Sequence, residues 1–204
     1  MCIRDRSKVN TKFCLFTQAD VVIKEDAIKQ LEKILLYKKD TIFVAPNFKK
    51  RLKNKLPKYE YVKKLDIACV LIDVKKLKKI GFFDEDFFLY WEDILLIDKI
   101  NKSNYKMIVA NNIKAIHDSG NSTSNNVSIK FIRESNFKYG ELLYDYKLFK
   151  LRKLKIIRQL FQNIFFFTFR LFLFGKKEYL HNLANIYGIL KFLMFLFRKI
   201  FFFN

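Results

Sequence analysis

The chain has 204 residues, 51% of them hydrophobic and 17% aromatic, with five glycines and two prolines. This composition excludes a disordered chain and suffices for one domain, or for one domain with an appendage. The formal net charge of +20 reflects either a compositional bias towards lysine or attraction to an anionic membrane or phosphorylated ligand. Because no recognition motif accompanies the charge, we expect no nucleic-acid partner.

The cysteines and the first residues carry little structural signal. Cys2, Cys14 and Cys69 show no CxxC spacing, which argues against a disulfide framework or a zinc site and suits a reducing cytoplasm. The first ten residues lack the apolar segment of a signal peptide. Residues 1–6 (MCIRDR) fit poorly with the rest of the chain, and we interpret them as an artefactual start.

Strand-like and helix-like segments then alternate along the chain. We expect strands at 12–17, 41–45, 66–73 and 105–110, and helices from Asp26 to about Tyr37, at 74–80 and at about 91–103. Asp26 is the predicted N-cap of the first helix, and Gly81 is the residue expected to follow the second. This alternation predicts an α/β domain with a mostly parallel sheet.

After about residue 126 the pattern becomes helical. Residues 128–150 are rich in aromatic side chains, and 151–204 are rich in Phe, Leu and Ile interrupted by Lys or Arg. The longest charge-free run of this tract, Tyr179 to Leu190, has 12 residues, fewer than the roughly 20 that span a bilayer. We interpret the tract as amphipathic helices in the membrane interface. A helical subdomain packed on the preceding domain or on a partner is the alternative.

Three groups of residues carry candidate chemistry. Asp20 follows a predicted strand, where a carboxylate can hold a divalent cation and hence a diphosphate, although taken alone it is better interpreted as an ordinary loop acid. Glu92 and Asp93 begin a predicted helix and offset its dipole, but Asp93 beside an aromatic wall also suits a general base acting on a sugar hydroxyl. His117, in a predicted loop rich in Gly, Ser and Asn, is either structural or a ligand for metal or phosphate.

In this order and spacing, the three groups resemble the second half of a family 2 glycosyltransferase with a GT-A fold, closest to the rhamnosyltransferase-like branch. The resemblance covers roughly residues 12–124. It rests on QADVVIKEDAIKQL for the DxD-type motif and its helix, IACVLI for an apolar strand, GFFDEDFFLYWED for the acidic aromatic segment, and HDSGNS for the His-x-x-Gly-x-Ser loop. Gln18 stands where the first acid or amide of the DxD-type motif is usual.

The resemblance implies an inverting enzyme that transfers a sugar from a nucleotide-diphospho-sugar to a surface-polysaccharide or lipid-linked acceptor. It would act on the inner face of a bacterial cell membrane, with Mg²⁺ or Mn²⁺ as cofactor. The implied residues are Asp93 as catalytic base, Asp84, Glu85, Trp91 and Glu92 on the acceptor side, and Asp20 and His117 at the metal and the donor diphosphate.

The implied architecture is a partial GT-A domain over 7–125, with a parallel-type sheet, and a helical, membrane-associating tail over 126–204. Complete family members have a preceding strand–helix–strand unit that binds the nucleotide, whereas only 19 residues precede Asp20 here. The resemblance therefore predicts a truncated chain that is inactive by itself. The alternative function is a non-enzymatic, basic membrane-binding or assembly protein with a degenerate sugar-binding half-domain.

Overall fold

The computed structural model describes residues 9–48, 57–117, 126–173 and 179–202. The chain divides into two compact units: unit 1 comprises residues 1–85 and 93–123, and unit 2 comprises residues 86–92 and 124–204. The structure is mixed α/β, with 55% helix and 21% strand. The predicted α/β class is confirmed at this level. The artefactual start proposed for residues 1–6 lies outside the described residues.

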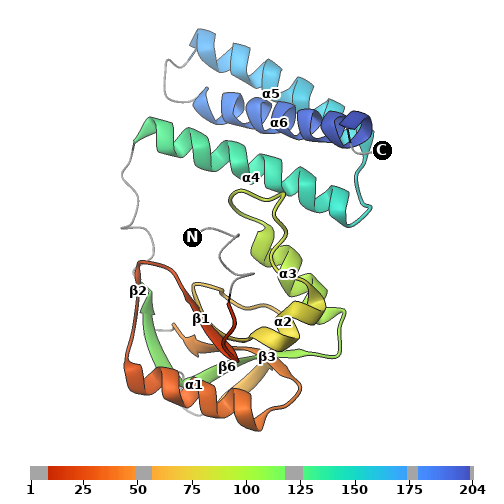
Figure 1. Cartoon of the computed structure of the whole chain (residues 1–204). Coiled ribbons are helices and arrows are strands. Elements are labelled where there is room, and N and C mark those ends of the chain that lie inside the picture. Colours follow the sequence, from red (N-terminus) through yellow and green to blue (C-terminus); the bar gives the residue numbers. More distant parts are fainter. Residues whose placement is uncertain (1–8, 49–56, 118–125, 174–178, 203–204) are drawn as a thin grey trace. The chain divides into compact units, whose positions relative to one another are not determined.

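Unit 1 is built around a six-stranded sheet (Figure 1). Its elements are β1 (Phe13–Thr17), β2 (Val21–Ile23), α1 (Glu25–Tyr37), β3 (Thr41–Asn47), β4 (Tyr59–Val62), β5 (Cys69–Asp73), α2 (Val74–Ile80), α3 (Glu92–Asn101) and β6 (Lys106–His117). The strand order is β1-β5-β3-β6-β2, and β4 pairs with β6.

The expectation of a mostly parallel sheet is wrong. Only β3 and β6 pair in parallel among the described strands, while β1–β5, β3–β5, β2–β6 and β4–β6 are antiparallel. A parallel neighbour requires a long crossover, usually a helix. The described part of the chain between β3 and β5 contains the strand β4 instead of a helix, and β5 returns antiparallel to β3.

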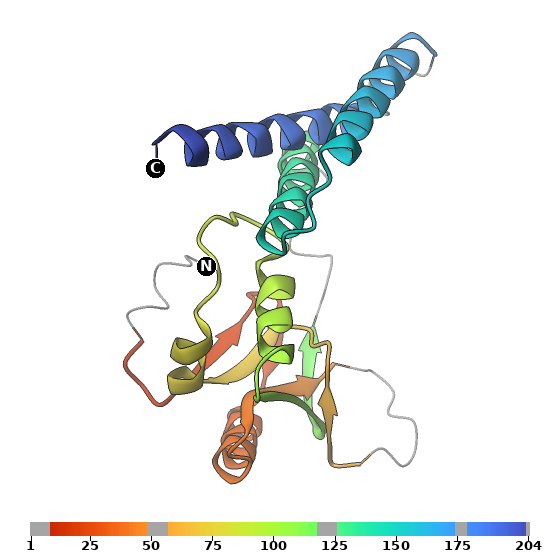
Figure 2. The same cartoon turned by 90° about the vertical axis from the view of Figure 1, so that its right-hand side faces the viewer.

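Helices cover both faces of this sheet, α1 on one and α2 with α3 on the other (Figure 2). Successive residues of a strand point to opposite faces. Phe43 therefore packs in the cluster that includes Leu96 of α3, whereas Val44 packs with Leu31 of α1. Burial on both faces explains why the central strands are continuously apolar in sequence.

The helix boundaries depart from the prediction at one position and agree at another. Asp26 is not the N-cap of α1; Lys24 is, without a side-chain hydrogen bond, and Asp26 lies in the first turn. Gly81 does follow α2, with φ of 93°, and its N–H donates to the carbonyl of Leu77. Glycine suits this position because side chains disfavour positive φ.

Strand β6 is longer than predicted and carries His117 at its end, so the expectation that His117 lies in a loop is wrong. Asn111 broke the apolar pattern in the sequence. In the structure, its side chain accepts a hydrogen bond from Asn47 Nδ2 at 3.1 Å and donates to the carbonyl of Pro57 at 3.0 Å, so the strand continues. Residues 118–124 of the predicted loop lie outside the described residues. Strands β2 and β4 were not predicted.

Unit 2 contains the helices α4 (Val127–Lys147), α5 (Lys153–Leu173) and α6 (Leu180–Phe202). Helix α6 buries Ala184, Ile189 and Phe192, and it packs against α4 and α5. Among the described helices, α6 alone is long and apolar enough to cross a membrane, judged by length and composition over Leu180–Phe201. The length of the charge-free run from Tyr179 to Leu190 did not predict a helix long enough to span, because Lys191 interrupts the apolar stretch.

Candidate functional site

The pairing of β2 with β6 brings Asp20 and His117 together. Val21 lies opposite His117 in an antiparallel register. Because Asp20 immediately precedes Val21, its Oδ1 atom lies 3.6 Å from Nε2 of His117. The two side chains are 16% and 17% exposed, so a ligand could reach them while their surroundings hold them in place.

A second carboxylate lies at the other nitrogen of the same imidazole. Oδ2 of Asp66 is 3.7 Å from Nδ1 of His117. The other oxygen of Asp66 accepts a hydrogen bond from the N–H of Ala68 at 2.9 Å, and the carbonyl of Ala68 accepts one from Gln18 at 2.8 Å. The segment after β1 and the segment before β5 are thereby tied together around His117.

Sequence patterns did not single out Asp66 as a site residue. In the sequence it is the first residue of an apolar, strand-like run, and no motif includes it. Its one signal was its position: an acid directly before a buried strand stands at the edge of a sheet, where ligands bind in α/β proteins.

The Asp20–His117 pair offers one carboxylate oxygen and one imidazole nitrogen to a divalent cation that a substrate could share. Among the described residues, no group of three or more His, Cys, Asp or Glu side chains could hold a metal ion. Mg²⁺ commonly takes one or two protein ligands and completes its coordination with water and substrate phosphates. A carboxylate and an imidazole that lie this close can both reach one such ion, and Asp66 is placed to orient the imidazole from behind.

Asp93 lies in the first turn of α3, in the same unit as Asp20 and His117. Its Oδ1 accepts a hydrogen bond from the N–H of Ile94 at 2.8 Å. This local bond leaves the second carboxylate oxygen open to other contacts. The bond is compatible both with a helix-start acid and with a general base, and the role of Asp93 stays a prediction.

The aromatic residues before Asp93 do not form one open wall. Phe87 is buried, and the ring of Trp91 lies between Phe137 and Tyr144 of α4, with centroid distances of 5.4 and 5.2 Å. Phe88 is 70% exposed. Of these aromatic side chains, Phe88 is therefore the best placed to stack on a ligand. Trp91 instead packs on α4 and holds residues 86–92 there.

The same segment contains an unusual backbone conformation. Tyr90 and Trp91 have φ angles of 68° and 71°, a region that costs about 1–2 kcal/mol for a residue with a side chain. Arg133 Nε donates to the hydroxyl of Tyr90 at 2.8 Å, and the hydroxyl of Tyr139 donates to the carbonyl of Asp86 at 3.1 Å. These contacts with α4 hold the strained pair. Such strain persists mostly at functional segments.

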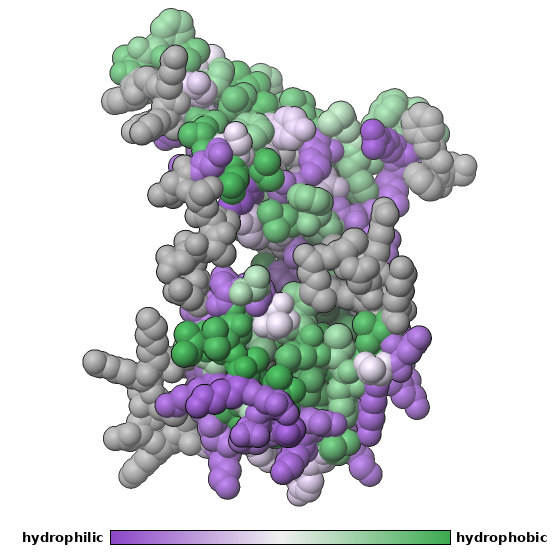
Figure 3. All heavy atoms as spheres, turned by 60° about the vertical axis from the view of Figure 1, so that its left-hand side comes forward, coloured by the Kyte–Doolittle hydropathy of each residue, from purple (hydrophilic) through white to green (hydrophobic). Residues whose placement is uncertain are grey.

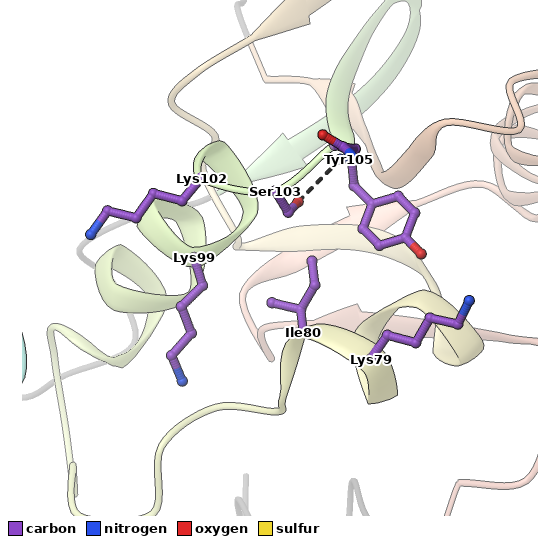
Figure 4. Close-up of a pocket in the computed structure, with 7 residues that line it drawn as sticks. Lys79, Ile80, Lys99, Lys102, Ser103 and Tyr105 are labelled. Carbon is purple, nitrogen blue, oxygen red and sulfur yellow. Dashed lines mark hydrogen bonds between the residues drawn. The ribbon is translucent and has the colours of Figure 1, made fainter.

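A separate hollow of about 810 Å³ lies at the opposite end of β6 from His117. Figure 4 shows that the ammonium groups of Lys79, Lys99 and Lys102 point away from one another. Lys79 and Lys99 lie in the last turns of α2 and α3, where a cation offsets the helix dipole. We assign this hollow no ligand.

Comparisons with protein-family models, with curated proteins and with solved structures found no match. Of the predicted site residues, Asp20 and His117 are adjacent. Asp84, Glu85 and Asp93 belong to unit 1, whereas Trp91 and Glu92 belong to unit 2.

Proposed function

We propose that the chain belongs to an inverting glycosyltransferase with a GT-A fold that uses a nucleotide-diphospho-sugar donor and a glycan or lipid-linked acceptor. The observation that carries this proposal is the 3.6 Å separation of Asp20 and His117 across β2 and β6. Two motif residues far apart in sequence, both expected at the donor diphosphate, lie side by side. The covered α/β sheet is consistent with the proposed GT-A assignment.

The proposed chemistry divides between two positions of unit 1. Asp20 and His117 would hold Mg²⁺ or Mn²⁺, which would neutralise negative charge on the departing nucleoside diphosphate. Asp93 would accept the proton of the acceptor hydroxyl. The acceptor oxygen would then bond to the anomeric carbon from the face opposite the diphosphate, the bond to the diphosphate oxygen would break, and the configuration would invert. Asp84 and Glu85 remain the proposed acceptor-side acids of unit 1.

The metal and diphosphate position can be tested directly by Mn²⁺ binding, followed by electron paramagnetic resonance, with and without inorganic pyrophosphate. We expect the full chain to bind Mn²⁺ more tightly when pyrophosphate is present. Asp20→Asn and His117→Gln should each weaken binding by about 10-fold or more. Glu32→Gln, which changes an exposed acid of α1, should leave binding unchanged. Equal binding by all four proteins would refute the assignment.

A second candidate function is a non-enzymatic membrane-binding or assembly protein. The observation that favours it is the large number of exposed apolar side chains on α5 and α6. Asp93→Asn distinguishes the two candidates in a sugar-transfer assay of a chain that also carries the nucleotide-binding unit: loss of transfer supports the enzyme, whereas wild-type transfer excludes Asp93 as its base. Under either candidate, we propose a peripheral position on the inner face of a bacterial membrane.

A further inference from the structure

One side of α5 exposes large apolar residues to solvent. Leu154, Phe161, Phe165 and Phe172 are 81%, 69%, 61% and 87% exposed. Their spacings of seven, four and seven place them within about 40° of one another around the helix axis. We call these four residues the α5 stripe. Figure 3 shows hydrophobic atoms gathered over the helices of unit 2. A continuous exposed stripe of this kind marks an interaction surface.

The charges around the stripe favour an anionic partner. Helices α5 and α6 contain four and three Lys or Arg residues respectively, and neither contains Asp or Glu. A hollow of about 560 Å³ at the start of α5 is lined by Arg152, Lys153, Leu154, Lys155 and Arg158. Phenylalanine beside Lys and Arg, without acids, is the composition of helices that lie in the headgroup region of anionic membranes.

Of the cationic side chains that line this hollow, Lys153 and Arg158 are better placed than Lys155 to bind an external anion. Lys155 is already held by Asp145 at 3.0 Å and by Glu141 at 3.4 Å. Lys153 and Arg158 are exposed and flank the α5 stripe. Their side chains are long enough to reach phosphates while the neighbouring apolar residues enter the acyl boundary.

Helix α6, although long enough to span a bilayer, is bonded to both of its neighbours. Lys191 Nζ donates to Asn136 Oδ1 of α4 at 2.7 Å and lies 4.6 Å from the ring centroid of Tyr139. On the other side, Asn182 and Asn185 donate to Asn163 Oδ1 of α5 at 3.1 and 3.2 Å. A spanning α6 would have to leave these polar groups without partners in hydrocarbon.

We propose that α5 lies in the headgroup region of an anionic lipid bilayer, with the α5 stripe at the acyl boundary and with Lys153 and Arg158 on lipid phosphates. The surface is independent of the sugar-transfer site, and the inference rests on the peripheral membrane position proposed above. The α5 stripe predicts that the helical tail binds the membrane peripherally. The helix that is long enough to span is α6, and hydrogen bonds hold it to α4 and α5.

Vesicle flotation of the full chain tests this proposal. The double variant Phe161→Ser/Phe165→Ser should weaken binding to mixed phosphatidylcholine–phosphatidylglycerol vesicles by about 10-fold or more. The matched control is Leu36→Ser/Tyr37→Ser, which removes exposed apolar side chains from α1 and should bind like the wild type. Lys153→Gln and Arg158→Gln should each weaken binding by about 5-fold.

Three outcomes would overturn the proposal. The first is unchanged binding by the Phe161→Ser/Phe165→Ser variant, or by Phe172→Ser if the double variant fails a circular-dichroism check of folding. The second is equal binding of the wild type to neutral phosphatidylcholine vesicles, which would remove the anionic partner. The third is retention in the vesicles after washing with alkaline carbonate, which would indicate a spanning helix.

Discussion

His117 has a carboxylate at each of its two ring nitrogens: Asp20 lies 3.6 Å from Nε2, and Asp66 lies 3.7 Å from Nδ1. The register of β2 and β6 sets the first contact, and the backbone bond from Ala68 to Asp66 supports the second. A histidine with an acid behind it has a defined ring orientation. Under the proposed function, Nε2 of His117 would face the metal ion, and Asp66 at Nδ1 would hold the ring in place.

Asp66 should therefore act through His117. We expect Asp66→Asn to weaken Mn²⁺ binding in the presence of pyrophosphate by about 10-fold, the lower end of the effect measured for such outer carboxylates. The loss should be smaller when His117 is already replaced by Gln, because Asp66 then has no ring to orient. Binding measured for the two single variants and the double variant tests this dependence. Equal losses from Asp66→Asn in both backgrounds would show that Asp66 acts independently of His117.

The sequence predicted Asp20 and His117 as site residues, but it did not predict the residues that hold them in place. Asp20 and His117 were selected through motif spacing, and the structure brings them together, although their chemical roles stay predictions. Asp66 was missed because its partner is 51 positions away (117 − 66), and only the strand pairing reveals the contact. The end of β6 was missed because its polar residues, such as Asn111, are satisfied by side-chain hydrogen bonds that no local pattern encodes.

The elements with strong local signals were predicted and those with weak signals were not. The apolar run of β3 and the helical spacing of α1 are local properties, and both elements form where expected. Strand β2 has three residues and β4 has four, too few for a periodic pattern, and both depend on pairing with β6. Strand direction depends on the connections between strands, which explains why the parallel sheet was wrongly expected.

The two acids at helix starts should differ in their contribution to stability. Asp73 is the N-cap of α2 and accepts the N–H of Lys76 at 3.0 Å, and its side chain also pairs with the Lys76 ammonium at 2.8 Å. We expect Asp73→Ala to lower the free energy of unfolding by about 1–2 kcal/mol. Asp26→Ala, which removes an exposed first-turn acid of α1, should lower it by only about 0.3–1 kcal/mol. Urea unfolding followed by circular dichroism compares the two, and an equal loss would contradict the capping assignment.

The contact between α4 and α6 requires glycine at position 188. A Cβ atom there would lie 2.5 Å from the carbonyl oxygen of Ser135 and 2.9 Å from Cβ of Lys138. Overpacking of this kind costs about 1–3 kcal/mol, and the first contact is with backbone, which cannot rotate away. Alanine also gains about 1 kcal/mol of helix propensity over glycine. We expect Gly188→Ala to be destabilising by up to about 2 kcal/mol in urea unfolding. A stabilised variant would show that propensity alone decides and that the helices can separate slightly.

Acid should weaken unit 2 through Glu141. Burial alone would raise the pKa of this carboxyl, but the hydrogen bond from Lys138 at 2.6 Å and the charges of Lys138 and Lys155 lower the pKa below its ordinary value of 4.5. A carboxyl with a lowered pKa in the folded state stabilises the protein above its unfolded pKa, and this contribution is lost as the pH falls through the folded pKa. We therefore expect Glu141→Gln to be less stable than the wild type at neutral pH and to lose less stability on acidification.

The stabilities of the wild type and of Glu141→Gln should converge at acidic pH, because the wild-type Glu141 is then protonated and carries no more charge than the glutamine. Thermal unfolding measured by circular dichroism at a series of pH values below and above 4.5 provides the comparison. Glu32→Gln is the matched control, since Glu32 is an exposed acid of α1 and its replacement should reproduce the wild-type pH dependence. If Glu141→Gln instead loses as much stability as the wild type between neutral and acidic pH, Lys138 and Lys155 do not stabilise the ionised carboxylate in the folded state.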